Sequence, residues 1–247
     1  MTSHGRFFLS AGLLYAMLWI LLAIEPHDRS DWALENALVV AAGVALVCSY
    51  KRLILSRISY TLIFMFLALH TIGAHWTYSL VPYDAAFHDI TGFSFDELMG
   101  WERNQYDRIV HFAFGLLLAY PIRELFLRVA EVRGAWGYFL PVALTMAAST
   151  LYELVEWWAA EIFGGDLGIA FLGTQGDVWD AQKDMWLATL GALIAMGITA
   201  LINVNLQKDF AREWSESLRV KQKSPLGEDE IARMLRAKQQ AGQDKSQ

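Results

Sequence analysis

Six long apolar stretches dominate this sequence and limit the folds that are open to it. A helix that crosses a membrane needs about 20 mostly apolar residues, because the hydrocarbon core is about 30 Å thick. The stretches that meet this requirement are residues 7–24, 32–50, 58–80, 108–127, 136–160 and 184–204. A soluble domain with 55% hydrophobic residues rarely carries such runs. We therefore predict an all-α polytopic membrane protein, a bundle of six transmembrane helices.

The two ends of the chain predict an uncleaved first span and a polar tail. The first apolar run is longer than that of a typical signal peptide and ends at Glu25-Pro26 without a small-residue cleavage site, so we predict an uncleaved span. Residues 1–206 then form the membrane domain. Residues 207–247 are too polar to form a core, and Ile231, Met234 and Leu235 at helical spacing predict one weak amphipathic helix in a cytoplasmic tail.

Lysine and arginine are distributed unevenly between the connections, which predicts the orientation of the chain. One set of connections carries Arg6, Lys51, Arg52, Arg57, Arg123, Arg128, Arg133, Lys208, Arg212 and Arg219. The alternate set carries only Arg29, Arg103, Arg108 and Lys183. Because cytoplasmic loops are rich in these residues, we predict a bacterial inner-membrane protein with both termini in the cytoplasm.

Polar residues gather at one end of the last four stretches. The segment Gly173 to Asp184, GTQGDVWDAQKD, carries three carboxylates that a helix would place on one face. The whole polar group is Asp177, Asp180 and Asp184 with His75, Asp107, His111, Glu153 and Glu156. In the predicted topology all eight lie in the outer third of the membrane, near the lipid headgroups.

Ionisable groups at membrane depth are expensive, about 2.5–3.5 kcal/mol each near the bilayer centre, and therefore indicate a function. The spacings of Asp107 with His111 and of Glu153 with Glu156 allow two side chains of one helix to reach one ion. We predict a divalent metal, Mg, Mn or Zn, whose candidate ligands are His75, Asp107, His111, Asp177, Asp180 and Asp184. The candidate catalytic acid or base is Glu153 or Glu156, and the candidate phosphate-binding residues are Arg108 and Lys183.

Structural roles are the alternative for each of these residues. Asp177 with Asp180, and Asn104 with Asp107, are also typical of the first turn of a helix, where acids offset free backbone amides. His75 could be an interfacial histidine. Glu153 and Glu156 could belong to a hydrogen-bonded cluster that holds helices together.

Four phrases of the chain resemble the YjdF family of bacterial inner-membrane proteins. They are HTIGAHWTY (70–78), NQYDRIVHFAFG (104–115), YELVEW (152–157) and GTQGDVWDAQKDM (173–185). The later half also resembles, more distantly, the VanZ-like membrane family linked to teicoplanin resistance. That resemblance implies matching positions at Asp107, His111 and Phe112, at Glu153 or Glu156, and at Asp180 or Asp184. Neither resemblance implies an established reaction.

These observations leave three function classes open. The first is a metal-assisted enzyme that acts on a lipid or lipid-linked headgroup at the outer leaflet. The others are a proton- or cation-coupled transporter and a structural or accessory membrane protein. The sequence shows no phosphate-binding glycine loop, zinc cysteine pattern or nucleic-acid signature, and its single cysteine, Cys48, cannot form an intramolecular disulfide. We also expect Gly115, Gly191 and Gly197 to allow close helix contacts.

Overall fold

The computed structural model describes residues 2–165, 172, 174–221 and 225–243. Helices make up all the regular structure in these residues, which confirms the all-α class. They are α1 (Ser3–Leu22), α2 (Arg29–Ser49), α3 (Arg57–His75), α4 (Tyr83–Thr91), α5 (Phe95–Met99), α6 (Tyr106–Val129), α7 (Trp136–Phe163), α9 (Asp180–Leu206), α10 (Phe210–Ser217) and α11 (Leu226–Gln243). Gly173 of the GTQGDVWDAQKD segment, and residues 222–224 and 244–247 of the predicted tail, lie outside the described residues.

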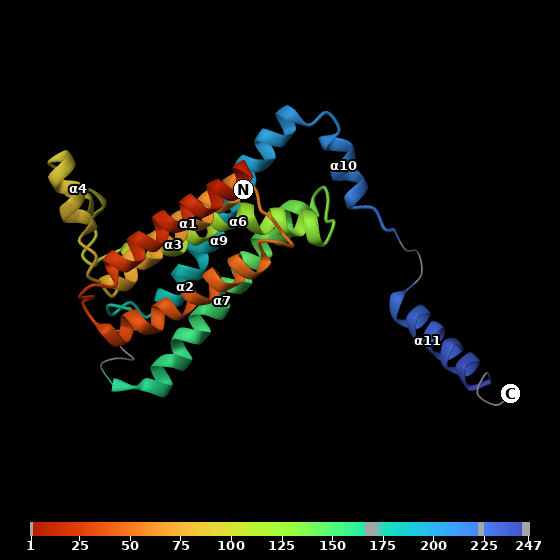
Figure 1. Cartoon of the computed structure of the whole chain (residues 1–247). Coiled ribbons are helices and arrows are strands. Elements are labelled where there is room, and N and C mark those ends of the chain that lie inside the picture. The colour runs from red at the N-terminus through yellow and green to blue at the C-terminus, as the bar shows by residue number, and fades with distance from the viewer. Residues whose placement is uncertain (1, 166–171, 173, 222–224, 244–247) are drawn as a thin grey trace.

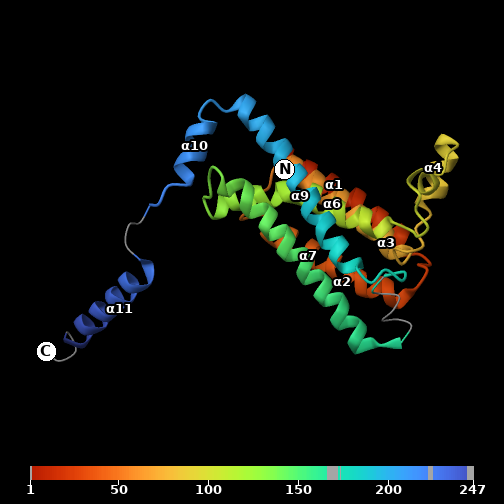
Figure 2. The same cartoon turned by 180° about the vertical axis from the view of Figure 1, so that it is seen from behind.

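Six of these helices are long and apolar enough to cross a membrane: α1, α2, α3, α6, α7 and α9. They lie side by side in one bundle, from which α4 projects at one end and α10 and α11 at the other (Figures 1 and 2). Large apolar side chains cover the outside of the bundle, and Leu13, Val47 and Leu201 are each more than 60% exposed. This is the pattern expected where lipid surrounds the helices, and the predicted bundle of six transmembrane helices is confirmed.

The third predicted span, 58–80, is too long, because α3 ends at His75. Thr77 and Tyr78 adopt the left-handed conformation, and the Tyr78 N–H donates to the Gly73 carbonyl across the end of the helix. The stretch from Trp76 to Leu80 carries no charged residue, so its pattern does not reveal the turn. The last span begins earlier than predicted, at Asp180 instead of residue 184.

Glycines bring α6 and α9 into backbone contact. A Cβ atom added to Gly115 would lie 1.8 Å from the Ala188 carbonyl oxygen, and one added to Gly191 would lie 2.2 Å from the Phe112 carbonyl oxygen. Only glycine permits this approach. The same expectation for Gly197 is wrong, because nothing lies within 4 Å of the position its Cβ would take. That glycine faces away from the contact.

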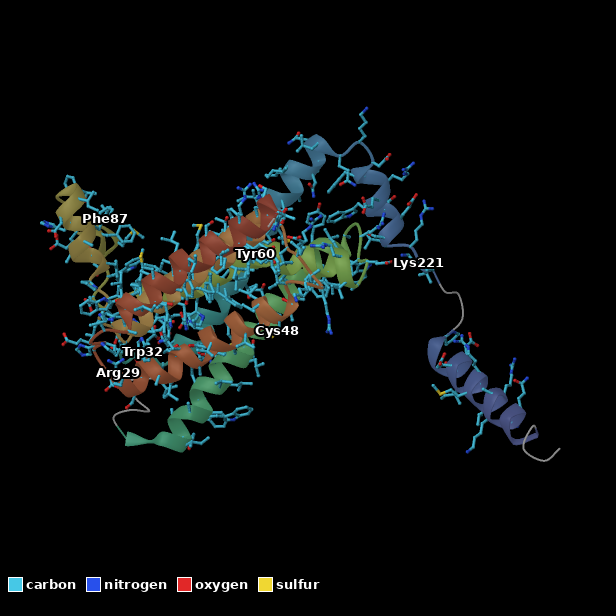
Figure 3. All side chains as sticks on the ribbon, viewed as in Figure 1. Arg29, Trp32, Cys48, Tyr60, Phe87 and Lys221 are labelled. Carbon is cyan, nitrogen blue, oxygen red and sulfur yellow. The ribbon has the colours of Figure 1, made fainter. Side chains whose placement is uncertain are left out.

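The predicted tail holds two helices in place of one. Phe210 and Trp214 of α10 pack against the Tyr138 ring of α7, and the Ser217 hydroxyl accepts a hydrogen bond of 2.9 Å from the Ala135 N–H. The helix α10 is therefore attached to the bundle, while α11 contains the predicted amphipathic stretch. Phe87 on α4 and Lys221 after α10 mark the two projecting regions, and Cys48 is a free, exposed thiol on α2 (Figure 3).

We call the end of the bundle where α3 and α7 end and α2, α6 and α9 begin the acidic end. It holds the polar residues singled out above. At the opposite end, Glu124 of α6 accepts a hydrogen bond of 2.8 Å from the Ser56 N–H and pairs with Arg128 at 3.0 Å. That acid is fully engaged in connecting α6 to the start of α3.

Candidate functional site

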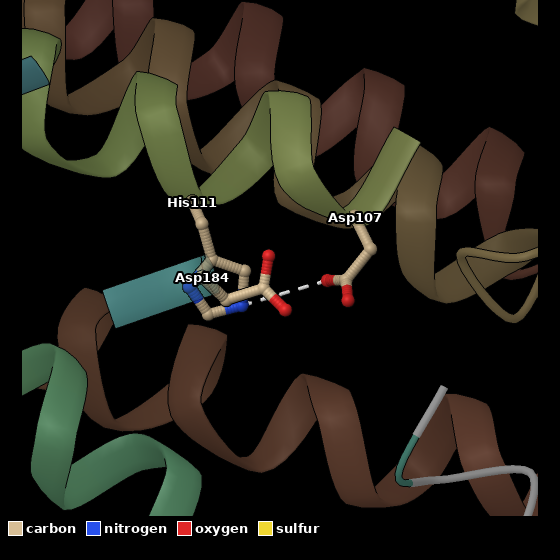
Figure 4. A group of neighbouring side chains, drawn as sticks. All are labelled: Asp107, His111 and Asp184. Carbon is tan, nitrogen blue, oxygen red and sulfur yellow. Dashed lines mark ion pairs between the residues drawn. The ribbon is translucent and has the colours of Figure 1, made fainter. Parts of the chain in front are cut away.

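Three side chains at the acidic end form a group that can hold a metal ion. Asp107, His111 and Asp184 each offer one ligand atom, and these atoms lie within 4.8 Å of one another. Asp107 and His111 are one turn apart on α6, and the glycine contact between α6 and α9 brings Asp184 beside them (Figure 4). The His111 Nε2 atom lies 3.5 Å from Asp107 Oδ1. Two oxygens and one imidazole nitrogen are suitable ligands for Mg, Mn or Zn.

The helix α7 adds the two glutamates of the predicted site. Glu153 Oε1 lies 3.6 Å from His111 Nε2, so this nitrogen is flanked by carboxylates from two different helices. Glu156 is one turn further along α7, and its residue is only 8% exposed. The distances from His111 Nε2 to Asp107 Oδ1 and to Glu153 Oε1 are both longer than a normal hydrogen bond. Space therefore remains between these three side chains.

Two carboxylate oxygens in this group have no partner. Asp184 Oδ1 and Glu153 Oε1 are buried and accept no hydrogen bond from any residue that the structure describes. Asp184 is only 2% exposed, so water does not compensate it from the surface. A buried carboxylate without a partner is destabilising unless it takes up a proton or binds a cation. These carboxylates therefore offer the negative charge and the unpartnered oxygens that a bound cation requires.

Asp177 and Asp180 have different surroundings, because they are paired with cations. Asp180 Oδ1 lies 2.8 Å from Arg103 Nη2 and 3.0 Å from Arg108 Nη2. Asp177 pairs with Arg108 and with Lys183. The Lys183 ammonium and the Trp179 backbone N–H hold the pKa of Asp177 well below its usual range. The structure does not bring these two aspartates into the group of Asp107, His111 and Asp184.

These ion pairs have a structural consequence. Arg103 also donates to the Thr174 carbonyl at 2.7 Å, and the Gln175 side chain donates to the Asn104 carbonyl at 3.1 Å. The residues before α9 are thus fastened to the residues before α6. Because Asp107 and Asp184 lie in the first two turns of these helices, the ion pairs set the relative position of two of the three candidate ligands.

His75 is also outside the group. Its Nδ1 lies 2.8 Å from the Leu22 carbonyl oxygen at the end of α1, and its ring packs edge-on against Trp76. The capping alternatives are seen in part. The N-cap positions of α9 and α6 are Trp179 and Gln105, one to two residues later than the alternatives placed them. Asp177 Oδ1 nevertheless accepts a hydrogen bond of 3.1 Å from the Trp179 N–H, and Asn104 Oδ1 accepts one of 3.0 Å from the Tyr106 N–H at the start of α6.

A second buried cluster, which the sequence pattern did not predict, is centred on Glu35 of α2. The Tyr152 hydroxyl donates to Glu35 Oε2 at 3.0 Å. His70 Nε2 lies 3.1 Å from the Glu35 carbonyl oxygen, which can only accept, so this nitrogen carries the hydrogen. The His70 Nδ1 atom then accepts a hydrogen bond from Tyr78.

This Glu35 cluster touches the first group, because the rings of Tyr152 and His111 meet edge to face with centroids 5.9 Å apart. An acid inside the second apolar stretch was the signal that could have revealed it. The prediction placed the whole site in the last four spans, and α2 has to be added to them.

The chain matches the DUF2238 family, described as predicted membrane proteins, over residues 7–205. It belongs to this family. The inner membrane protein YjdF of Escherichia coli (strain K12) is 38% identical over 185 residues, which cover 74% of this chain and 84% of that protein. The predicted YjdF-like family is thereby confirmed. No solved structure matches the chain. The residues matched to the DUF2238 family include both polar clusters of this integral membrane protein.

Proposed function

We propose that this protein is a membrane-embedded enzyme that uses one divalent cation to act on a lipid or lipid-linked headgroup. Asp107, His111 and Asp184 bind the cation, which is Mg, Mn or Zn. The observation that carries the proposal is the pair of buried, unpartnered oxygens on Asp184 and Glu153 beside His111. A cation held by Asp107, His111 and Asp184 would compensate the Asp184 oxygen directly and would leave the Glu153 oxygen free beside it.

Glu153 is the proposed general base. A divalent cation makes a bound water acidic enough to lose a proton near neutral pH. The free oxygen of Glu153 faces the ligand group and can accept that proton, while Glu156 is one turn away and can relay it. The water would then attack the headgroup, breaking its ester bond and leaving the proton for the departing oxygen.

Arg108 and Lys183 are proposed to bind the phosphate of such a headgroup. Both now pair with Asp177, and the Lys183 side chain is 48% exposed. A phosphate that enters from the acidic end can therefore replace Asp177 as the partner of Lys183. His75, Asp177 and Asp180 remain predicted ligands, but nothing in their present contacts supports that role.

We also propose that the acidic end faces the periplasm and that both termini are cytoplasmic. The distribution of lysine and arginine supports this orientation. The resemblance to the VanZ-like family includes Asp107 and His111, which are two of the three residues proposed to bind the cation. In a Cys48→Ser background, a cysteine introduced by Lys221→Cys should react with a membrane-impermeant maleimide only after the cells are opened.

The competing function is transport of protons or cations. A transport path requires polar groups or water through the membrane. Beyond His111 the space between the helices is lined almost entirely by apolar side chains, and the acid at the far end, Glu124, is engaged with Ser56 and Arg128. These features favour the enzyme.

The experiment that tests the proposal is product analysis with envelope lipids. The purified protein is incubated in mixed micelles with the cation and a total lipid extract from bacterial envelopes, and the products are identified by mass spectrometry. We expect headgroup release that stops with a chelator and in Glu153→Gln. The exposed Glu161→Gln, two turns further along the same helix, is the matched control and should keep the activity. Release that is equal in Glu153→Gln and wild type would refute the mechanism.

A further inference from the structure

A large apolar cavity extends from the candidate site into the bundle. Its volume is about 780 Å³, and it lies between α2, α3, α6 and α7. Representative lining residues are Ala42 and Leu46 of α2, Phe66 of α3, and Leu118 and Leu125 of α6. A cavity with such walls takes an apolar ligand.

The acidic end of the cavity is different, because Asp107, His111 and Tyr152 line it. Ser149 lies one turn deeper on α7 and also lines the cavity. Its residue is only 2% exposed, and its hydroxyl has no hydrogen-bond partner among the described residues. An ester or phosphoester oxygen would satisfy this hydroxyl. The cavity therefore suits a ligand with a polar group at one end and a long apolar remainder.

The dimensions of the cavity restrict that ligand further. From Asp107 to Leu125 the wall follows 18 residues of α6, or about 27 Å at about 1.5 Å per residue. One leaflet of the hydrocarbon core is only about 15 Å deep, half of about 30 Å. The volume of about 780 Å³ over this length gives a mean cross-section of about 29 Å², enough for one hydrocarbon chain.

The cavity is also accessible from the side of the bundle. Leu38 of α2 and Leu125 of α6 both line it, and they are 48% and 39% exposed. Both are on the surface that lipid covers in a spanning helix. A hydrocarbon chain can therefore reach the cavity from the bilayer without passing through water.

We infer that this cavity binds the single long tail of the lipid substrate, a chain longer than the acyl chain of an ordinary phospholipid. The tail lies along α6 between Val110 and Leu125, and the group that joins it to the headgroup lies at Ser149 and His111. This inference rests on the proposed function for the headgroup, but the tail site itself consists of different residues.

The test is photo-crosslinking with two probes in phosphatidylglycerol vesicles. The first is a polyprenyl phosphate whose extended tail is about 27 Å long, the length of the cavity wall, with a diazirine at the end of that tail. The second is a phosphatidylglycerol with a diazirine at the end of an acyl chain. We expect the first probe to label peptides that contain Ile122 and Leu125. A chain of one leaflet's length would reach only about ten residues along α6, to about Leu118. Efficient labelling at Leu118 by the second probe, without labelling at Leu125 by the first, would overturn the inference.

Matched substitutions complete the test. Ala42→Trp fills the cavity from α2 and should reduce labelling about tenfold, whereas Val44→Trp, on the exposed face of the same helix, should leave it unchanged. Ala148→Trp fills the cavity from α7, and this variant is used in place of Ala42→Trp if the Tm of Ala42→Trp is lower than that of wild type. Labelling equal in both filled variants and wild type refutes the tail site. Asp184→Asn removes a proposed metal ligand and should keep full labelling, so failure of the metal chemistry alone is recognised separately.

Discussion

Substituting Gly115 by alanine should weaken the contact on which the candidate site depends. The added methyl group would lie 1.8 Å from the Ala188 carbonyl oxygen, which is about 1.6 Å short of the 3.4 Å at which ordinary contact begins. The obstacle is backbone, which cannot rotate away as a side chain can. The helices α6 and α9 must therefore separate or shift along each other.

The magnitude follows from the cost of overpacking. Inserted methyl groups destabilise well-packed interiors by about 1–3 kcal/mol, and a backbone clash belongs at the upper end. A loss of about 3 kcal/mol lowers the Tm of a chain of this size by about 6–12 °C. Because Asp107 and Asp184 are on the two helices that separate, we expect the affinity for the cation to fall in the same variant.

The assay is thermal unfolding in detergent, with and without added Mn²⁺. Gly197→Ala is the matched control, since it is on the same helix as Gly191 and no atom lies within 4 Å of the new methyl group. It should melt no lower than wild type, because alanine favours a helix more than glycine does. Equal melting of Gly115→Ala and Gly197→Ala would refute the close packing of α6 and α9.

Three further substitutions test the polar groups. Asp184→Asn should raise the Tm of the metal-free protein, because it removes a buried charge without a partner, which carries a penalty of about 1–3 kcal/mol. The same variant should abolish the Tm increase on adding Mn²⁺. A lower Tm of the metal-free variant would contradict this. Tyr152→Phe leaves Glu35 Oε2 without its donor and should cost about 1–3 kcal/mol in chemical denaturation, and no loss would exclude the hydrogen bond. The pKa of Asp177 is lowered in the folded protein, so its contribution to stability is complete above its ordinary pKa of 3.8 and is lost as the pH falls through the lowered value. Melting curves of wild type should therefore shift downward on acidification below about pH 4 more than those of Asp177→Asn, and parallel curves would contradict the ion pairs.

The part of the site that could be predicted is the part encoded within one helix. Asp107 and His111 are four residues apart, and this spacing alone places both on one face of α6. Glu153 stood out because it interrupts an apolar stretch. The contacts between helices were less accessible to sequence reasoning, since Gly115 and Gly191 lie at a helix contact while Gly197 does not, and nothing local distinguishes the three.

The partners of the aspartates could not be predicted for a related reason. Asp177 and Asp180 have the same residue type and helical spacing as Asp184, and only the fold shows that Arg103 and Arg108 neutralise the first two and leave the third. Glu35 was missed because α2 was not counted among the helices of the site. Its contact with Tyr152 joins residues 117 positions apart, which no periodicity reveals.

The most direct test of the cation site is the metal content of the purified protein. Elemental analysis after detergent purification and equilibration with Mg²⁺, Mn²⁺ or Zn²⁺ should find about one ion per chain for wild type. The matched control Glu161→Gln, which changes an exposed acid further along α7, should retain the ion. Asp184→Asn and the double variant Asp107→Ala/His111→Ala should lose it. Metal-free wild-type protein, or equal metal in wild type and Asp184→Asn, would contradict the proposal that these three residues bind a cation.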